Sequence, residues 1–208
     1  MGDFSQNVIV ANLHDFSIRS TEQIEKDLLK FSKERKLELI LPCLYSELEG
    51  DALPNIVNEI SKTKYLNHVI IGLDQANKAQ AKKAWKFFKK LKTPFSILWN
   101  DGPKLKKLDK ELKGIDLAPK QMGKGRNVWY CIGMAIARDE ARSVALHDCD
   151  IKTYDRRMLA KLFYPVENPL FNYEFCKGYY PRIADNKMHG RVARLLVNPL
   201  LTAMEKTI

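Results

Sequence analysis

The chain has 208 residues, a length that predicts one domain or one large domain with a short annex. Hydrophobic residues make up 45% of it, enough for a packed core, and the net charge of +10 favours polyanions and small anionic molecules as partners. Without an apolar run of about 18 residues or a recognisable export signal, neither a transmembrane helix nor secretion is expected, and a cytoplasmic protein with reduced cysteines is.

Helical and strand patterns alternate along the first three quarters of the chain. An amphipathic helix is expected over residues 21–35, with Ser20 or Thr21 near its cap. An apolar strand follows over 37–44 and is predicted to stop near Pro42. The later elements expected in this part are strands over 67–74, 93–101 and 143–150, helices over 52–63, 78–91 and 123–141, and a charged helical or irregular piece over 104–116.

The last quarter of the chain breaks this alternation. A helix is predicted over residues 155–166, and the aromatic, alternating stretch 171–183 indicates a strand or one arm of a hairpin. A closing helix is predicted over residues 190–207, bent near Pro199.

Strands that alternate with helices predict an α/β fold with a mainly parallel, Rossmann-like sheet and helices on both faces. Continuously apolar strands fit this arrangement because both faces of such a sheet are buried. Ligands of open α/β sheets bind at the carboxyl ends of the strands. The polar or distinctive residues expected at those ends are Pro42, Asp74, Asn100, Asp101, Asp148 and Asp150.

The stretch VALHDCD ends an apolar strand in Asp148 and Asp150, two positions apart. If the strand extends that far, both side chains face one spot, where two negative charges need a positive partner. Mg²⁺ or Mn²⁺ is the simplest partner, since both prefer oxygen ligands and Mg²⁺ often bridges a carboxylate to a substrate phosphate. The alternative is a solvent-facing acidic turn.

The sequence Gly123-Lys124-Gly125-Arg126 precedes an apolar helix. Glycines let backbone amides approach a phosphate, a helix start adds partial positive charge, and Lys124 and Arg126 would supply full charges. A P-loop is excluded because the upstream glycine and the following Ser or Thr are missing. A plain basic loop is the alternative.

Further candidate residues lie near the C-terminal end of the sequence and among the residue types that bind metals. Gly190 and Arg191 open the closing helix and indicate a second anion site, with ordinary helix capping as the alternative. His147 and His189 suit either metal binding or structural roles. The four widely spaced cysteines fit no zinc pattern.

Residues 78–120 hold thirteen lysines against four acids. A solvated lysine face explains them, because the apolar residues of the helix over 78–91 form one stripe that the lysines mostly flank. A nucleic-acid-binding module is the rival interpretation. It is disfavoured because no exposed aromatic residues interleave with the lysines and no RNA-binding signature is present.

Four stretches, ILPCLYSELEG, GKGRNVWYCIG, VALHDCD and HGRVARLLVNPLL, occur in the order found in glucosyl-3-phosphoglycerate synthases, which the chain resembles from about residue 37 to its end. The resemblance implies a retaining glycosyltransferase with the GT-A fold, formed as one nucleotide-sugar-binding domain over 1–208 with acceptor-side elements over 171–208. Members of that family are longer, so the C-terminal part is expected to be missing. The chain differs from the usual pattern at Cys149, where Ser is commoner, and at Ala193, where Thr is usual.

The resemblance also implies roles for individual residues. Asp150 is the expected direct metal ligand and, with Lys124, the catalytic group, whereas Asp148 is expected to contact the metal or the ribose. The expected nucleotide-binding residues are Pro42, Glu47, Asp74, Gln75, Lys124 and Asp148. Gly190 and Arg191 are expected to bind the acceptor.

The implied reaction transfers glucose from UDP-glucose or GDP-glucose to 3-phosphoglycerate, with Mg²⁺ or Mn²⁺ as cofactor. The resemblance implies neither a membrane nor a nucleic acid as partner. A related GT-A enzyme with another sugar or acceptor, such as a mannosyl transferase acting on a glycerate, remains an alternative, and so does a homodimer.

Overall fold

The computed structural model describes residues 13, 15–16, 18–171, 173–178, 182–184, 187–189 and 196–205. The chain forms two compact units, one of Arg19–Cys176 and the other of Met1–Ile18 together with Lys177–Ile208. Across the residues that are described, no helix combines the length and the apolar character that crossing a membrane requires.

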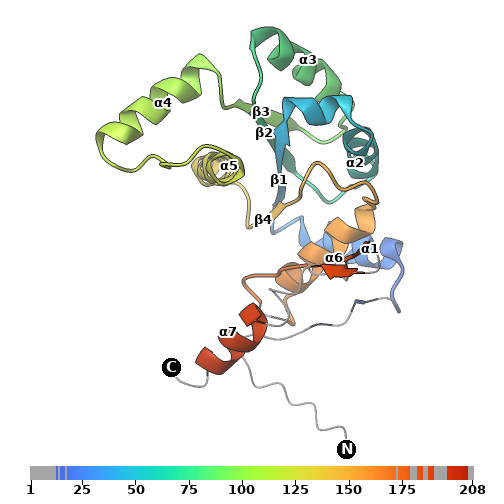
Figure 1. The fold of residues 1–208 in the computed structure, drawn as a ribbon. Coiled ribbons are helices and arrows are strands. Elements are labelled where there is room, and N and C mark those ends of the chain that lie inside the picture. The colour runs from blue at the N-terminus through green and yellow to red at the C-terminus, as the bar shows by residue number, and fades with distance from the viewer. Residues whose placement is uncertain are drawn as a thin grey trace, which may run out of the picture. The chain divides into compact units, whose positions relative to one another are not determined.

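The larger unit is built on a four-stranded parallel sheet (Figure 1). Its strands are β1 (Leu37–Leu44), β2 (His68–Asp74), β3 (Phe95–Trp99) and β4 (Ser143–Leu146), in the order β3-β2-β1-β4. The two central strands are buried along nearly their whole length, as their continuous apolar sequences predict. The predicted parallel α/β sheet is therefore confirmed.

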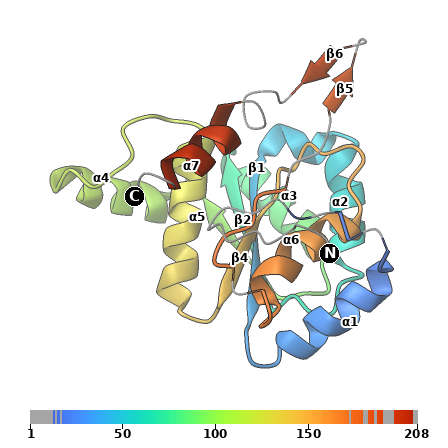
Figure 2. The same ribbon diagram turned by 90° about the horizontal axis from the view of Figure 1, so that it is seen from below.

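Helices cover both faces of this sheet, as predicted (Figures 1 and 2). Helix α5 (Lys124–Arg138) packs on β1 and β2 from one side, while α2 (Ala52–Ile60), α6 (Arg156–Glu167) and α1 (Thr21–Phe31) lie on the other. The remaining helical elements of this unit are the 3₁₀ helix η1 (Tyr45–Glu49), α3 (Lys78–Phe88) and α4 (Pro103–Gly114). Helix α1 begins in a capping box made by Ser20 and Gln23.

Helix α5 lies unusually close to the middle of the sheet. The side-chain amide of Asn127 donates to the carbonyl of Gly72 at 2.7 Å, and a Cβ atom on Gly72 would collide with Asn127 and with the sulfur of Cys131. Glycine in β2 thus permits a close approach of the helix, which fixes where α5 begins relative to the strand ends.

Strand β1 continues past Pro42 to Leu44, so the prediction that it stops near Pro42 is wrong. The carbonyl of Ile40 accepts from the amide of His147, which follows β4. The backbone nitrogen of Pro42, two residues further along β1, faces the same side of the strand. Strand β4 pairs with β1 only as far as Ile40 and Leu146. A proline is tolerated in this central strand because β4 does not extend beside it and so does not need its missing N–H.

The C-terminal elements differ from their predictions. The described residues 173–178 are irregular, so the strand predicted over 171–183 is wrong there, and only β5 (Arg182–Ala184) is formed, pairing antiparallel with β6 (Lys187–His189). Helix α7 (Asn198–Glu205) has Pro199 as its second residue. The two residues before this helix, 196–197, are π-helical, so the geometry of the helix changes next to Pro199, and residues 190–195 and 206–207 of the predicted helix lie outside the described residues.

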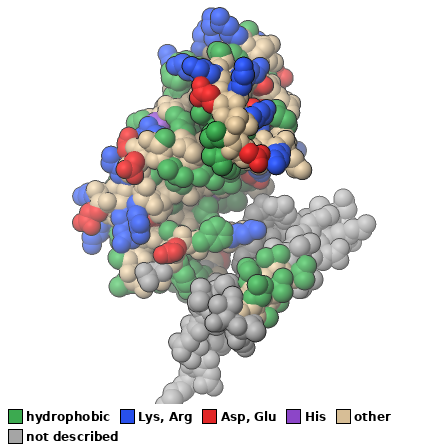
Figure 3. Space-filling view, turned by 90° about the vertical axis from the view of Figure 1, so that its left-hand side faces the viewer, with side chains coloured by type: hydrophobic (Ala, Val, Ile, Leu, Met, Phe, Trp, Pro, Cys, Tyr) green, Lys and Arg blue, Asp and Glu red, His purple; other side chains and the backbone are tan. Residues whose placement is uncertain are grey.

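All thirteen lysines of residues 78–120 are exposed. The view onto the side that carries α4 and α5 shows basic side chains gathered at its upper end, with acidic ones among them (Figure 3). Helix α3 buries Ala84 and Phe88 and helix α4 buries Leu105 and Asp109, so the lysines form the outer faces of both helices. This distribution is that of a solvated face.

Candidate active site at the end of the sheet

The candidate site lies where the strand order reverses. The chain builds β1, β2 and β3 outward in succession and then returns to place β4 on the other side of β1. Loops that leave β1 and β4 at such a switch point diverge and open a crevice beyond the strand ends. In this sheet β4 ends beside Ile40, four residues before β1 ends at Leu44.

Asp148 and Asp150 lie in the loop after β4 and not on the strand itself. The strand predicted over 143–150 ends at Leu146, so the alternation of side chains along a strand does not place the two carboxylates. Asp148 is half-buried and Asp150 is exposed. The sequence predicts a divalent cation as their positive partner, and the structure places the ammonium of Lys124 2.5 Å from Oδ1 of Asp148.

Glu47 joins this group from the 3₁₀ helix after β1. Its Oε2 accepts from the backbone N–H of Leu44 at 2.8 Å, which holds the carboxylate at the end of the strand. Burial raises the pKa of Glu47 above its ordinary value, the negative charge of Asp150 raises it further, and the hydrogen bond from Leu44 and the charge of Lys124 oppose the change. The structure thus brings Glu47, Lys124, Asp148 and Asp150 into one electrostatic group.

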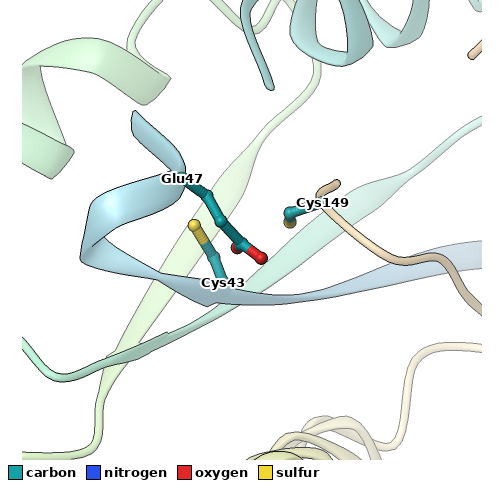
Figure 4. Close-up of side chains that lie close together, drawn as sticks. All are labelled: Cys43, Glu47 and Cys149. Atoms are coloured by element: carbon teal, nitrogen blue, oxygen red, sulfur yellow. The ribbon is translucent and has the colours of Figure 1, made fainter. Parts of the chain in front are cut away.

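Two cysteines lie beside Glu47. Cys43 at the end of β1 and Cys149 between the two aspartates are both buried, and their side chains lie close to that of Glu47 (Figure 4). One ligand atom from each of the three residues lies within 4.8 Å of the other two. Sequence spacing gave no signal for this cluster, because residues so far apart meet only through the pairing of β1 with β4.

Asp74 and Gln75 lie at the end of β2, in line with Leu44 of the neighbouring strand. Asp74 is buried, and its Oδ1 accepts from the N–H of Gln75 at 3.0 Å, while Gln75 adopts a left-handed conformation with φ of 54°. Oδ2 of Asp101 accepts from the N–H of Ala76 at 3.0 Å. These hydrogen bonds shape the rim of the sheet, and they are local to the ends of β2 and β3.

Arg126 does not have the role that its position in the GKGR sequence suggested. Its guanidinium is buried, lies 3.0 Å from Oδ1 of Asp109 and stacks over the ring of Tyr130. The hydroxyl of Tyr130 donates to the same carboxylate at 2.5 Å, and burial with this hydrogen bond raises the pKa of Tyr130 to about 12. Arg126 therefore joins α4 to α5, and the expectation that it offers a free charge to a phosphate is wrong.

The helix start itself has the form expected of an anion site. Gly123 precedes α5 with φ of 120°, a conformation that glycine adopts easily, and Lys124 is the first helical residue. An open pocket of about 410 Å³ lies beside this first turn; its lining residues are Pro119, Lys120, Gln121, Met122, Gly125 and Arg126. Backbone amides at the start of α5 are thus accessible next to Lys124.

The remaining residues considered as site residues are two histidines, the expected acceptor residues and Pro42. His147 is buried, its Nδ1 lies 3.0 Å from the hydroxyl of Tyr154, and burial lowers its pKa to about 4, so it serves the structure. Gly190 and Arg191, predicted to bind the acceptor, lie outside the described residues, and His189 ends β6. Pro42 is buried within β1 and not at its end.

Two curated proteins resemble this chain along almost all of its length. It is 41% identical over 204 residues to a glucosyl-3-phosphoglycerate synthase of Persephonella marina and 40% identical over 207 residues to one of Methanococcoides burtonii. Each match covers 98% of this chain and 50% of the relative, so the chain spans half the length of these proteins. No family model matches the chain.

Solved structures resemble the fold at much lower identity. A glucosyl-3-phosphoglycerate synthase of Mycobacterium tuberculosis in complex with Mn²⁺, UDP and glucosyl-3-phosphoglycerate matches 94% of this chain and 57% of its own, with a TM-score of 0.52 and 16% identity. The same enzyme with Mn²⁺, UDP and phosphoglyceric acid matches 88% of this chain and 54% of its own, with a TM-score of 0.51. The GT-A fold expected from the sequence is thus confirmed, and the chain is a relative of the glucosyl-3-phosphoglycerate synthases that corresponds to about half their length.

Proposed function

We propose that this chain forms the nucleotide-sugar-binding part of a metal-dependent glycosyltransferase that moves glucose from a nucleoside diphosphate sugar to 3-phosphoglycerate, with retention of the anomeric configuration. The observation that carries the proposal is the grouping of Lys124 with Glu47, Asp148 and Asp150 at the switch point of a GT-A sheet. The names of the two curated relatives support the choice of sugar and acceptor.

The residues present fit a divalent cation. Asp148 and Asp150 offer carboxylate oxygens, the ligands that Mg²⁺ and Mn²⁺ prefer, and Asp150 is proposed as the direct ligand. The negative charge of Asp150 acts on the Glu47 carboxylate, so a cation beside Asp150 would relieve a repulsion that is already present. When bound, the cation supplies charge neutralisation to the departing diphosphate.

The chain itself supplies the remaining contacts to the donor. Lys124 is proposed to stabilise the negative charge that develops on the diphosphate, helped by the free amides at the start of α5. Pro42, Glu47, Asp74 and Gln75 are proposed to form the nucleoside pocket. Asp148 is proposed to accept from a ribose hydroxyl or to contact the cation through water.

The acceptor is proposed to attack from the face that the diphosphate leaves. Its hydroxyl oxygen forms the new glycosidic bond, the bond to the diphosphate breaks, and the hydroxyl proton passes to a diphosphate oxygen. No carboxylate of the chain is assigned as a nucleophile. Gly190 and Arg191 are proposed to hold the acceptor, whose phosphate and carboxylate suit an arginine.

Donor binding is tested by calorimetry with UDP-glucose in the presence and absence of Mn²⁺. Wild-type protein is expected to bind more tightly with Mn²⁺, and Asp150→Asn is expected to lose that increment. Asp139→Asn is the matched control, because Asp139 is an exposed left-handed helix cap where Asn is well tolerated. Equal affinity with and without Mn²⁺ in the wild type would contradict the proposal.

Transfer is tested with a panel of UDP-glucose, GDP-glucose and GDP-mannose against 3-phosphoglycerate, on this chain and on a longer form. Metal-dependent formation of glucosyl-3-phosphoglycerate, with the donor's anomeric configuration seen by NMR, is the expected result. Arg191→Ala is expected to raise the KM for the acceptor much more than that for the donor. If the protein prefers another sugar or acceptor, the proposed reaction is wrong, and the chain belongs to a related GT-A enzyme with that substrate.

A further inference from the structure

Cys43, Glu47 and Cys149 form a cluster of possible metal ligands. The proposed transfer reaction uses no metal bound there. Its members come from the end of β1, from η1 and from the loop after β4, and the three side chains converge (Figure 4). Two sulfurs and one carboxylate oxygen form a donor set that suits Zn²⁺. Mg²⁺ and Mn²⁺ prefer oxygen ligands alone, so this donor set differs in chemistry from the neighbouring aspartates.

The three ligand atoms are nearly as close to one another as they would be around a bound Zn²⁺. Zinc lies about 2.3 Å from sulfur and about 2.0 Å from oxygen, so tetrahedral ligand atoms are separated by roughly 3.5 Å. The ligand atoms of Cys43, Glu47 and Cys149 already lie within 4.8 Å of one another. A contraction of about an ångström, mostly rotation of side chains, would close the site.

The surroundings orient and shield these ligands. The N–H of Leu44 holds one carboxylate oxygen of Glu47, as partners of metal ligands commonly do, and the thiol of Cys43 lies within hydrogen-bonding reach of the same carboxylate. Both cysteines are buried, and Glu47 is half-buried. The positive charge of Lys124 acts on Glu47 and compensates part of the negative charge that two thiolates and a carboxylate would bring.

We propose that Cys43, Glu47 and Cys149 form a thiolate site for Zn²⁺, with the fourth tetrahedral position open to solvent. Three protein ligands and one open position make an exchangeable site and not a closed structural one. The site shares Glu47 with the proposed nucleoside pocket, but its two cysteine ligands and its preferred metal differ from those proposed for the donor, so the two proposals can fail separately. Its Cys149 nevertheless lies between Asp148 and Asp150, so zinc would fix the loop that carries both acids.

The proposal is tested by titrating the reduced protein with Co²⁺ as a spectroscopic substitute for Zn²⁺. One equivalent is expected to produce the thiolate-to-cobalt charge-transfer band, and Zn²⁺ is expected to abolish it, whereas excess Mn²⁺ is not. Cys43→Ser and Cys149→Ser are each expected to weaken Zn²⁺ binding by at least about 100-fold, since even outer partners of a metal are worth up to that much. Wild-type protein without the band would overturn the proposal.

Matched variants separate this site from other thiols and from the proposed donor site. Cys131→Ser and Cys176→Ser are expected to keep the band, because neither cysteine belongs to the cluster. Asp150→Asn is also expected to keep it, whereas that variant loses Mn²⁺-dependent donor binding under the proposed function. A band that survives in the double variant of Cys43 and Cys149 would refute the assignment.

X-ray absorption on the zinc-loaded wild type gives a second measurement that needs no variant. Two sulfur ligands at about 2.3 Å with nitrogen or oxygen ligands at about 2.0 Å are expected. A shell made of nitrogen and oxygen alone would show that zinc binds elsewhere and would overturn the proposal, even if the cysteine variants failed to fold.

Discussion

The ammonium of Lys124 lies 2.5 Å from Oδ1 of Asp148, so the first residue of α5 is tied to the first acid of the loop after β4. Both side chains are about half exposed, at 57% and 43%. Pairs with that exposure add little to stability, because solvent screens them. The ion pair therefore serves mainly to position Lys124 next to the acids that are proposed to bind the metal and the donor.

Lys124→Met is expected to weaken UDP binding by roughly 10–100-fold, because a hydrogen bond to a charged group contributes about 1.5–3 kcal/mol. The free energy of unfolding is expected to stay nearly constant, since the ion pair is screened. Calorimetry with UDP and Mn²⁺ gives the affinity. Lys110→Met, a change of an exposed lysine of α4 that does not line this pocket, is the control and is expected to bind UDP nearly as the wild type does.

Gly123→Ala and Gly125→Ala are expected to change stability in opposite directions. A side chain at Gly123 would be forced into a positive φ of 120°, which costs about 1–3 kcal/mol although no atom lies near enough to clash. Gly125 is helical and has the same open surroundings, so alanine there is expected to stabilise by about 0.4–1 kcal/mol. Urea unfolding measures both, and a stabilising effect of Gly123→Ala would contradict the backbone argument.

Asp109→Ala is expected to lower the free energy of unfolding by about 3 kcal/mol, because it leaves the buried guanidinium of Arg126 without its carboxylate. The hydroxyl of Tyr130 loses its acceptor as well. Urea unfolding gives the value. Glu111→Ala on the same helix removes an exposed pair with Lys107 and is expected to change stability by less than about 0.5 kcal/mol. Similar losses in the two variants would count against the buried network.

His147 predicts a dependence of stability on pH. Burial lowers its pKa from 6.5 to about 4 in the folded chain, so between these values the unfolded chain binds more protons. The contribution of neutral His147 is fully present above pH 6.5 and is lost as the pH falls toward about 4, in total about 3 kcal/mol. Urea unfolding with a chelator is expected to show this loss in the wild type, and His147→Gln is expected to have a shallower profile. Parallel profiles would exclude His147 as the source.

The sheet was predictable because its signals are local. Strands β1 and β2 are apolar throughout, and their observed bounds match the prediction to within one residue. Strand β4 is shorter than predicted, because the chain turns away from β1 after the amide of His147 donates to Ile40. The effect of Pro42 was misjudged for a related reason, since a proline ends a strand only where a neighbour needs its N–H.

The candidate site was only partly predictable. Lys124 and Asp148 were found from their positions at a helix start and a strand end, whereas Glu47 came only from the family resemblance, and the structure brings the three together. The burial of Arg126 depends on Asp109 in a different helix, a contact that no spacing in the sequence reveals. The meeting of Cys43 with Cys149 likewise follows from strand order, which a list of cysteine spacings does not contain.

Pro42 has a consequence for the edge of β1. Strand β1 runs beyond the end of β4, and an unpaired strand edge of this kind invites another segment to add to the sheet. A proline at that edge has no hydrogen to give, so a segment that tried to pair there would gain one bond fewer. Pro42 thus makes the addition of a further strand to this edge of β1 less favourable.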